Sequence, residues 1–377
     1  MAEGSSARPL LAALEQVLDG RASALLPVPA GADRGSTLSA LRVGDAIDDD
    51  IALVVTTSGT TGAPKGALLT AAALTASAAS THHRLGGPGR WLLALPPYHI
   101  AGVQVLVRSL LAGTVPVELD VSAGFDISGL PSAVDELGSG RHYTALVAAQ
   151  LAKALTDPAA AAALAEFDAV LVGGGPAPRP ILDTAAAADI RVVRTYGMSE
   201  TAGGCVYDGV PLDGVKVRVD ADGRIVIGGP TLANGYRNPP DPDPFAEPGW
   251  FRTDDIGAVD NSGVLTVLGR ADEAISTGGL TVLPQPVEAA LRTHPAVSDC
   301  AVFGLADERL GQRVVAAVVL ADGHSPPSLE ELRAHVMRTL DHTAAPRELH
   351  IVEALPMRGI GKVDRQALAG QAGKRLS

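Results

Sequence analysis

The order of apolar and polar positions predicts an α/β architecture over roughly the first 200 residues. Short runs rich in β-branched residues alternate there with Ala- and Leu-rich stretches of helical periodicity. The expected strands are 51–57, 90–96, 113–119, 143–149 and 168–174. The expected helices include 67–79, 127–139 and 148–167. Alternation of this kind favours a largely parallel sheet.

A second pattern begins near Val215. Residues 215–229, VKVRVDADGRIVIGG, read as two alternating strands joined at Asp222-Gly223, a dipeptide typical of tight hairpin turns. A Pro-rich loop over 238–250 and a strand over 263–269 follow. We therefore expect a β-rich subdomain over about 206–271, within a first domain that covers 1–271.

A third pattern follows residues 269–274. It contains a helix over 283–294, two strands within 300–323, and a final strand over 348–355. A further helix begins at Ser328, with Glu331 three positions later in a capping-box arrangement. This order predicts a small, mobile α+β domain over 272–377, with a hinge at Asp272.

Composition narrows the class of protein. The 377 residues are 46% hydrophobic and 19% charged, which is typical of a globular chain with a sizeable core. A net charge of −12 disfavours nucleic-acid binding and broad binding to anionic membranes. The two cysteines provide no metal-ligand spacing and suit a reducing compartment. With no secretory signal pattern and no apolar run near the ~20 residues of a membrane span, we expect a cytoplasmic protein.

A Gly-rich loop, TTSGTTGAPKG at 56–66, follows an apolar strand and suggests phosphate binding. It is not the G-x-x-x-x-G-K-S/T loop of many nucleotide-binding proteins. Pro64 precedes Lys65 and has no N–H to donate, and Gly66 stands where a hydroxyl would hold Mg²⁺. The alternative is an ordinary surface turn, but the loop carries five hydroxyls, on Thr56, Thr57, Ser58, Thr60 and Thr61.

This loop is the first of five motifs that occur in a fixed order. They are TTSGTTGAPKG (56–66), RTYGMSET (194–201), WFRTDD (250–255), GRADEAISTGG (269–279) and GIGKVDRQAL (359–368). Together they resemble the adenylate-forming superfamily of acyl-CoA synthetases, adenylation domains and luciferases, over about residues 50–370. Within it, LPPYHIAG, GGGPAPRP and TYGMSETAGG look most like the o-succinylbenzoate–CoA ligases of menaquinone biosynthesis.

The resemblance implies a two-step reaction. A carboxylic acid reacts with ATP to give an acyl-adenylate and pyrophosphate, and the acyl group then passes to the thiol of CoA. Two anions must meet, so catalysis consists mostly of positioning and charge neutralisation. The expected substrates are ATP, CoA and 2-succinylbenzoate, with Mg²⁺ as cofactor, and we take a homodimer as the working hypothesis for the assembly.

The same resemblance implies a nucleotide site. Tyr196 would stack on adenine, Asp255 would accept bonds from the ribose hydroxyls, Arg270 would contact the ribose or a phosphate, and Glu200 would ligate Mg²⁺. The expected nucleotide-binding residues are Thr57, Ser58, Gly59, Thr60, Thr61, Gly62, Lys65, Gly174, Gly175, Pro176, Thr195, Tyr196, Gly197, Met198, Ser199, Asp255, Arg270 and Lys362.

Three residues are the expected catalytic groups. The resemblance implies that Lys362 reaches the α-phosphate and the acyl carboxylate, where a point charge on a flexible stem can neutralise both. Lys65 would add charge at the β,γ-phosphates. His99 would line or gate the acyl pocket; the alternative is a neutral histidine packed against Tyr98.

The acyl and CoA sites are expected to involve further residues. 2-Succinylbenzoate carries a second carboxylate that needs a cation or several hydrogen-bond donors. Arg179 is the candidate for it, with a solvent-facing arginine as the alternative. Gly197 and Thr201 are also expected to bind the substrate. Gly278 and Gly279 would contact CoA.

Some features depart from the common family pattern. Asp254 stands where many relatives have Gly, and the lysine that often follows the hinge aspartate is absent. Other functions therefore stay open: a ligase for another aryl or acyl acid, an adenylation domain that loads a carrier protein, or a non-catalytic nucleotide-binding relative. A pure scaffold would not need the set of Lys65, Glu200, Asp255, Arg270 and Lys362.

Overall fold

The chain divides into two compact units. The computed structural model describes residues 7–29, 34–57, 64–357 and 363–374. The N-terminal unit comprises Met1–Arg218, Val226–Arg252 and Asn261–Leu265, and the C-terminal unit comprises Val219–Ile225, Thr253–Asp260 and Thr266–Ser377. The division runs through the segment expected to be the β-rich subdomain. The hinge at Asp272 stays a prediction.

A largely parallel sheet forms the centre of the N-terminal unit. Among the described residues its strand order is β4-β3-β5-β6-β7-β8-β9. The strands are β3 (Arg90–Leu93), β4 (Val117–Glu118), β5 (His142–Val147), β6 (Ala169–Gly173), β7 (Val192–Met198), β8 (Gly203–Tyr207) and β9 (Val210–Pro211). The pairs from β4 to β7 are parallel, and β8 and β9 add antiparallel pairs. The predicted α/β class is confirmed.

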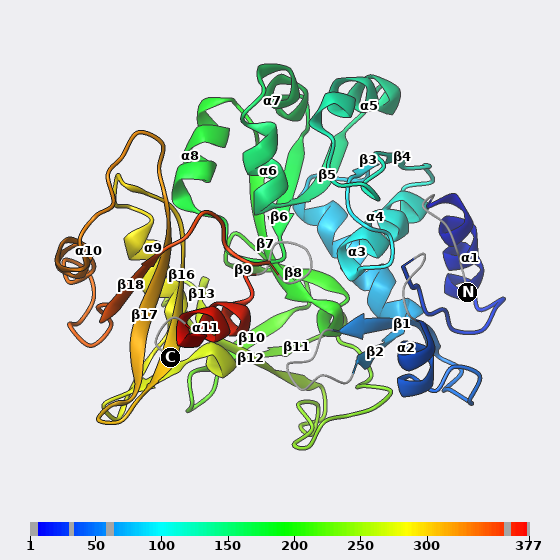
Figure 1. Ribbon diagram of the computed structural model, residues 1–377. Coiled ribbons are helices and arrows are strands. Elements are labelled where there is room, and N and C mark those ends of the chain that lie inside the picture. The colour runs from blue at the N-terminus through cyan, green and yellow to red at the C-terminus, as the bar shows by residue number, and fades with distance from the viewer. Residues whose placement is uncertain (1–6, 30–33, 58–63, 358–362, 375–377) are drawn as a thin grey trace. The chain divides into compact units, whose positions relative to one another are not determined.

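Helices cover both faces of this sheet. α5 (Leu130–Leu137), α6 (Ala148–Ala154), α7 (Pro158–Ala165) and α8 (Arg179–Ala187) gather on one side, and α3 (Ala71–Arg84) and α4 (Ile100–Leu111) on the other (Figure 1). Side chains alternate along a strand, so neighbouring residues enter different cores. Leu92 joins the core under α5–α8, while Trp91 is buried near His82 of α3 and Arg108 of α4. α1 (Arg8–Leu18) packs on α4, and α2 (Arg34–Ala40) is short.

Two predicted helices were wrong at their limits. The start of 67–79 is a strand, β2 (Lys65–Thr70), which pairs antiparallel with β1 (Ile51–Thr57). Thr70 then caps α3, because its hydroxyl accepts a bond from the Ala73 N–H at 3.0 Å. The stretch 148–167 is broken at Asp157, whose carboxylate caps α7 through the Ala160 N–H at 2.8 Å. The predicted strand 113–119 shortens to β4.

The predicted hairpin near Asp222-Gly223 is present. It joins β10 (Lys216–Val219) to β11 (Arg224–Gly228), in a sheet completed by β12 (Trp250–Val259) and β13 (Leu265–Arg270). The Asp220 carboxylate accepts bonds from the N–H groups of Asp222 and Arg224, each at 2.9 Å. Gly223 has a φ of +77°, which residues with a side chain rarely adopt.

The C-terminal unit contains a sheet in the order β15-β14-β17-β16, with β18 beside β17. Its strands are β14 (Ile275–Thr277), β15 (Leu280–Val282), β16 (Val297–Asp307), β17 (Gly311–Leu320) and β18 (Glu348–Ile351). α9 (Pro284–Leu291) and α10 (Leu329–Val336) pack on one face, and α11 (Arg365–Lys374) on the other (Figure 1). The capping box is confirmed: Ser328 N–H donates to Glu331 at 2.7 Å, and Glu331 N–H donates to Ser328 at 3.2 Å.

In the part of the chain that the structure describes, every helix is too short or too polar to span a lipid bilayer.

Candidate functional site

A tight turn between β7 and β8 places Glu200. The turn is a 3₁₀ helix, η2 (Ser199–Thr201), and Glu200 is only 7% exposed. The Thr201 hydroxyl accepts a bond from the Met198 N–H at 2.9 Å and donates to the Gly203 carbonyl at 2.7 Å. A Cβ added at Gly197 would lie 2.1 Å from that carbonyl, so the two strands approach as only glycine permits.

Glu200 lies beside two residues from other parts of the chain. Its carboxylate accepts a hydrogen bond from the buried Tyr236 hydroxyl at 2.5 Å. The Nζ atom of Lys65 lies 5.3 Å from the centre of the Tyr236 ring, in the cation–π range. Thus Lys65 and Glu200, predicted from separate motifs, approach one tyrosine. Sequence reasoning did not single out Tyr236.

Asn238 fixes the backbone on both sides of Lys65. Its side-chain oxygen accepts a bond from the Gly66 N–H at 3.1 Å, and its amide nitrogen donates to the Pro64 carbonyl at 2.6 Å. Thr57 pairs with Lys65 across β1 and β2. The other predicted loop residues, Ser58, Gly59, Thr60, Thr61 and Gly62, lie outside the described residues, as does Lys362.

The two predicted adenine motifs lie on neighbouring strands. GGGP follows β6, TYG belongs to β7, and Val172 pairs with Arg194 in parallel register. A Cβ added at Gly173 would lie 2.3 Å from the Thr195 hydroxyl oxygen. Gly174 has a φ of +79°, and Gly174, Gly175 and Pro176 are exposed, whereas Thr195 and Tyr196 are partly buried. The motifs are therefore adjacent, and their adenine role stays a prediction.

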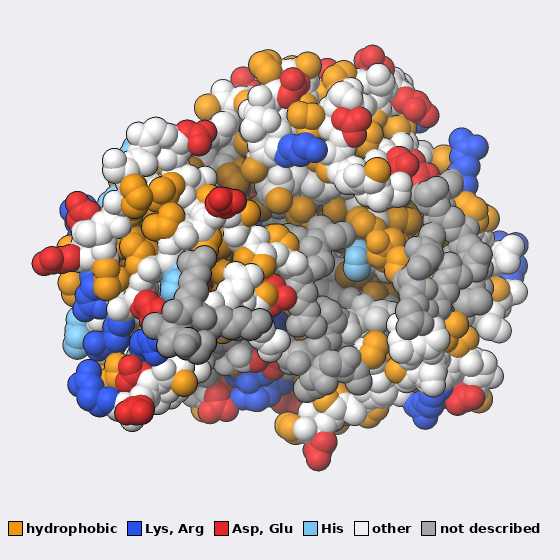
Figure 2. Space-filling model, viewed as in Figure 1, with side chains coloured by type: hydrophobic (Ala, Val, Ile, Leu, Met, Phe, Trp, Pro, Cys, Tyr) orange, Lys and Arg blue, Asp and Glu red, His pale blue; other side chains and the backbone are white. Residues whose placement is uncertain are grey.

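His99 stands at the residue that precedes α4. Its ring lies 4.7 Å from that of Tyr98, centre to centre, and the residue is exposed. A Cβ added at Gly102 would lie 2.2 Å from the Pro96 carbonyl oxygen, so the PPYHIAG turn also requires glycine. Figure 2 shows hydrophobic side chains around a hollow over α3 and α4.

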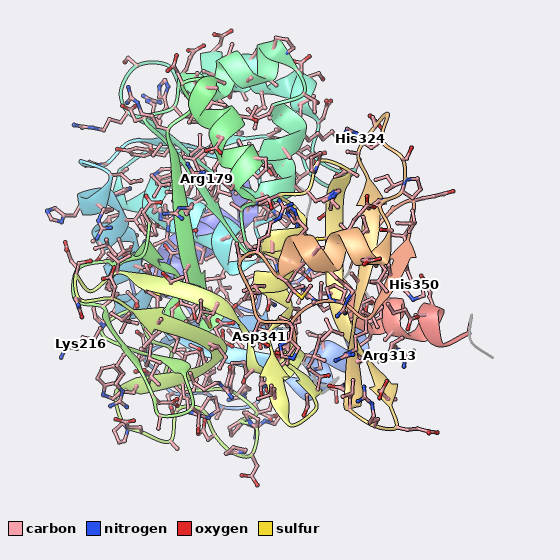
Figure 3. All side chains as sticks on the ribbon, turned by 90° about the vertical axis from the view of Figure 1, so that its left-hand side faces the viewer. Arg179, Lys216, Arg313, His324, Asp341 and His350 are labelled. Carbon is pink, nitrogen blue, oxygen red and sulfur yellow. The ribbon has the colours of Figure 1, made fainter. Side chains whose placement is uncertain are left out.

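Arg179 lies on the surface at the start of α8 (Figure 3). Its side chain is 83% exposed, and its Nε donates to the Asp183 carboxylate at 2.7 Å. This environment resembles the solvent-facing alternative, although its substrate role stays a prediction.

A buried cation on α4 was missed by sequence reasoning. Arg108 is 3% exposed, donates to the Tyr207 hydroxyl at 3.3 Å, and has its guanidinium carbon 5.0 Å from the Trp91 ring centre. Its Nε has no hydrogen-bond partner, and no carboxylate in the described ranges forms an ion pair with it. One turn earlier, the Gln104 side-chain oxygen also has no partner. Burial lowers the pKa of Arg108.

His82 packs in the same cluster. Its Nε2 accepts a bond from the Trp91 indole N–H at 3.4 Å, which fits a neutral ring. Burial, and then the charge of Arg108, lower the pKa of His82 from 6.5 to about 4.

In the C-terminal unit, adjacent acids on β12 point to different environments. Asp255 is 9% exposed, and its N–H donates to the Thr253 hydroxyl at 3.1 Å. Asp254 is exposed and pairs with Arg224. Strand alternation explains the difference. The buried acid is the one predicted to bind ribose.

Arg270 bridges the predicted ribose acid and the predicted hinge. It donates to both oxygens of Asp272 at 2.8 Å, and its Nη1 lies 3.6 Å from an Asp255 oxygen. Gly278 and Gly279 form the exposed turn between β14 and β15, with φ of +59° and +80°. Their CoA role stays a prediction.

Two protein-family models match separate parts of this chain. A model described as AMP-binding enzyme matches residues 14–237, and one described as AMP-binding enzyme C-terminal domain matches 286–362. The "Probable 2-succinylbenzoate--CoA ligase" of Mycobacterium tuberculosis (strain ATCC 25618 / H37Rv) is 75% identical over 375 residues, 98% of this chain and 97% of that protein. The 2-succinylbenzoate--CoA ligase of Geobacillus sp. (strain WCH70) is 34% identical over 344 residues, 85% and 69% of the two chains.

Solved structures give the same result. The o-succinylbenzoate CoA synthetase of Bacillus subtilis, in complex with its acyl-adenylate intermediate, matches with a TM-score of 0.74 at 29% identity. The alignment covers 86% of this chain and 72% of that one. The same protein in complex with ATP and magnesium matches with a TM-score of 0.73 and the same identity.

We predict that His82 makes the folded state sensitive to acid. In the unfolded chain its pKa returns toward 6.5, so the unfolded state binds a proton before the folded state does. The stability is therefore complete above about pH 6.5 and is lost as the pH falls toward about 4. In urea unfolding, the free energy of unfolding should fall less over this pH range for His82→Gln than for the wild type. The glutamine stays neutral and can still accept the bond from the Trp91 N–H. Parallel pH curves for the two proteins would contradict the assignment.

Proposed function

This chain belongs to the AMP-binding enzyme family, and we propose that it is an AMP-forming 2-succinylbenzoate–CoA ligase. The observation that carries the proposal is the 75% identity, over 98% of the chain, to a relative of that name. The enzyme activates the succinyl carboxylate as an acyl-adenylate, releases pyrophosphate, and transfers the acyl group to CoA. Its product is an intermediate of menaquinone biosynthesis. The buried free thiols of Cys205 and Cys300 agree with a cytoplasmic enzyme.

Glu200 is suited to hold Mg²⁺ with the help of ATP. Among the described residues, no three acidic, histidine or cysteine side chains gather as a metal site. Mg²⁺ commonly takes only one or two carboxylates, with phosphates and waters completing its octahedron. The Tyr236 hydroxyl fixes one oxygen of Glu200, which orients the carboxylate. When bound, Mg²⁺ neutralises phosphate charge; Lys65 adds a second positive charge nearby.

Each part of the nucleotide is assigned to the residues of one predicted motif. GGGP and Tyr196 receive the adenine, Asp255 the ribose hydroxyls, and the loop 56–66 the phosphates. Lys362 serves the adenylation step. Its removal from the site before CoA enters is the reason for a hinge at Asp272.

Arg108 is the group that we assign to the second carboxylate of the acid. A guanidinium out of water is costly unless an anion pairs with it. No carboxylate in the described ranges does so for Arg108. The ring carboxylate of 2-succinylbenzoate supplies that anion, and the unpartnered Nε is a donor for it. Tyr207 and Trp91 hold the guanidinium in place. Arg179, already paired with Asp183 at the surface, is the competing candidate.

The proposed function predicts a specific acid requirement. ATP–pyrophosphate exchange should be supported by 2-succinylbenzoate far better than by benzoate, succinate or a long-chain acid. EDTA should abolish it, and added Mg²⁺ should restore it, because phosphate neutralisation needs the metal. Exchange without CoA, followed by thioester formation on its addition, would establish the two steps. If another acid supports pyrophosphate exchange equally well, that acid becomes a candidate substrate. If no acid supports exchange, the protein is a non-catalytic relative.

Substitution of Arg108 should change acid selectivity without unfolding the protein. Arg108→Met removes a buried, unpaired charge at similar volume, so the free energy of unfolding should stay equal or rise. KM for 2-succinylbenzoate should rise about 10- to 150-fold, the equivalent of one charge-assisted bond of about 1.5–3 kcal/mol. KM for 4-oxo-4-phenylbutanoate, which lacks the ring carboxylate, should change little. If Arg179→Ala shows this pattern and Arg108→Met does not, Arg179 is the substrate residue.

The neighbouring acids of β12 provide a matched pair. Asp255→Asn should weaken AMP binding in calorimetry, because charge-assisted ribose bonds of about 1.5–3 kcal/mol each become neutral ones. Asp254→Asn should lower AMP affinity much less, since it weakens exposed ion pairs with Arg224 and Arg270 and leaves the Asp255 carboxylate in place. Unchanged affinity in Asp255→Asn would remove this residue from the ribose site.

A further inference from the structure

Arg365 makes three directed contacts at the start of α11. Its Nη1 donates to Glu273 at 2.9 Å, its Nη2 donates to Glu288 at 2.7 Å, and its Nε donates to the Val302 carbonyl at 3.1 Å. The partners come from η3 (Ala271–Glu273), α9 and β16. A planar guanidinium can meet three acceptors at fixed angles, and a lysine ammonium cannot reproduce this geometry.

Glu288 makes the junction rigid. Its side chain is 3% exposed, and the oxygen that Arg365 contacts also accepts the Val302 N–H at 2.8 Å. Arg292 lies 3.9 Å from the other oxygen. A carboxylate removed from water in this way is held where its donors are, because any displacement leaves a buried charge unpaired.

Glu273 connects the junction to the segment that contains Asp272. Its second oxygen accepts a bond from the Gln285 side chain at 2.5 Å. Gln285 in turn packs against Gly269, where an added Cβ would lie 2.3 Å from its side-chain oxygen. The GRADEA motif is therefore tied to α9 on one side and to Arg365 on the other.

The two residues before Arg365 contact the segment that ends at Met357. Met357 pairs with Val363 in an antiparallel bridge, and the Asp364 N–H donates to the Pro356 carbonyl at 2.8 Å. The Asp364 carboxylate then accepts the Ala367 N–H at 2.9 Å, as a cap of α11. In the sequence, Lys362 directly precedes Val363.

We propose that Arg365 is a positioning residue for adenylation, which fixes residues 363–365, the residues that follow Lys362 in the sequence, to the segment Ala271–Glu273. The inference rests on the proposed function, in which Lys362 serves adenylation. Because Asp272 is the proposed hinge, the junction makes residues 363–365 and Glu273, the residue after the hinge, one rigid piece. When the chain rotates at Asp272, the residues that follow Lys362 then move together with Glu273.

The kinetic test uses Arg365→Lys, which keeps the charge and loses the three-way geometry. ATP–pyrophosphate exchange should fall in kcat by about tenfold to hundredfold, the typical effect of a misplacement near 1 Å, with KM for ATP nearly unchanged. Conversion of supplied acyl-adenylate and CoA to thioester should stay within about twofold, because Lys362 has no part in that step.

A double substitution separates positioning from general damage. In a Lys362→Ala background, Arg365→Lys should cause no further loss of exchange, since the group that it positions is gone. A matched control is Arg313→Lys on β17. Arg313 is similarly buried and donates to Glu348 at 2.7 Å, and Glu348 also contacts His350 of β18, so these contacts lie outside η3 and α11. It should retain wild-type exchange kinetics. A further loss in the double variant, or an equal loss in the control, would overturn the proposal.

Hydrogen exchange tests the anchor without any substrate. Arg365→Lys should speed exchange of the Asp364 amide severalfold, and Arg313→Lys should not. Glu273→Gln provides the same comparison if Arg365→Lys fails to fold. An unchanged Asp364 amide overturns the proposal even if the wild-type enzyme is active. If the wild-type enzyme shows no ATP–pyrophosphate exchange with any acid, the proposed function is overturned instead. The hydrogen-exchange rate of the Asp364 amide still shows whether Arg365 anchors this segment.

Discussion

Glu200 is a carboxylate that folding has taken almost out of water, and the surrounding structure is organised around that constraint. An isolated buried charge is costly, so the group needs a donor at a fixed place. Tyr236 provides it at 2.5 Å. The turn that presents Glu200 requires Gly197 next to the Gly203 carbonyl, and the Thr201 hydroxyl closes it. The result is an oriented carboxylate whose partner, Tyr236, also contacts the cation of Lys65, an arrangement that suits a metal–phosphate complex.

The same constraint distinguishes the other buried charges. Glu288 is satisfied within the protein by Arg365 and the Val302 N–H, so its role is structural. Arg108 is different, because its contacts are an aromatic face and one hydroxyl, and its Nε has no partner. A cation left in this state is stabilised when an anionic ligand arrives. The difference between these two charges is therefore the physical basis for assigning one to the fold and the other to the substrate.

Short sequence patterns correctly predicted the features that depend on residues close together in the chain. The strand 51–57 agrees with β1, the Asp222-Gly223 hairpin and the Ser328 cap are present, and Asp255 is the buried acid of its pair. Residues 67–70 were placed in a helix, because an apolar run of that length fits either structure until the pairing with β1 decides. Tyr236 and Arg365 were missed because their partners, Glu200 and Glu273, are distant in sequence and no motif spacing links them. Arg108 was hidden within an apolar helical pattern.

The proposed two-step reaction needs some charged side chains that stay in place and one that moves. In the proposed function, the cation of Lys362 stands between two anions during adenylation and leaves before the thiol of CoA attacks. A charge that leaves cannot be buried in a satisfied ion pair, because breaking that pair would slow each cycle. Its support can be buried, however, and we assign this role to Arg365, three residues after Lys362, with Glu288 and Glu273. In this proposal, the buried support stays intact in both steps, and only the catalytic cation leaves between them.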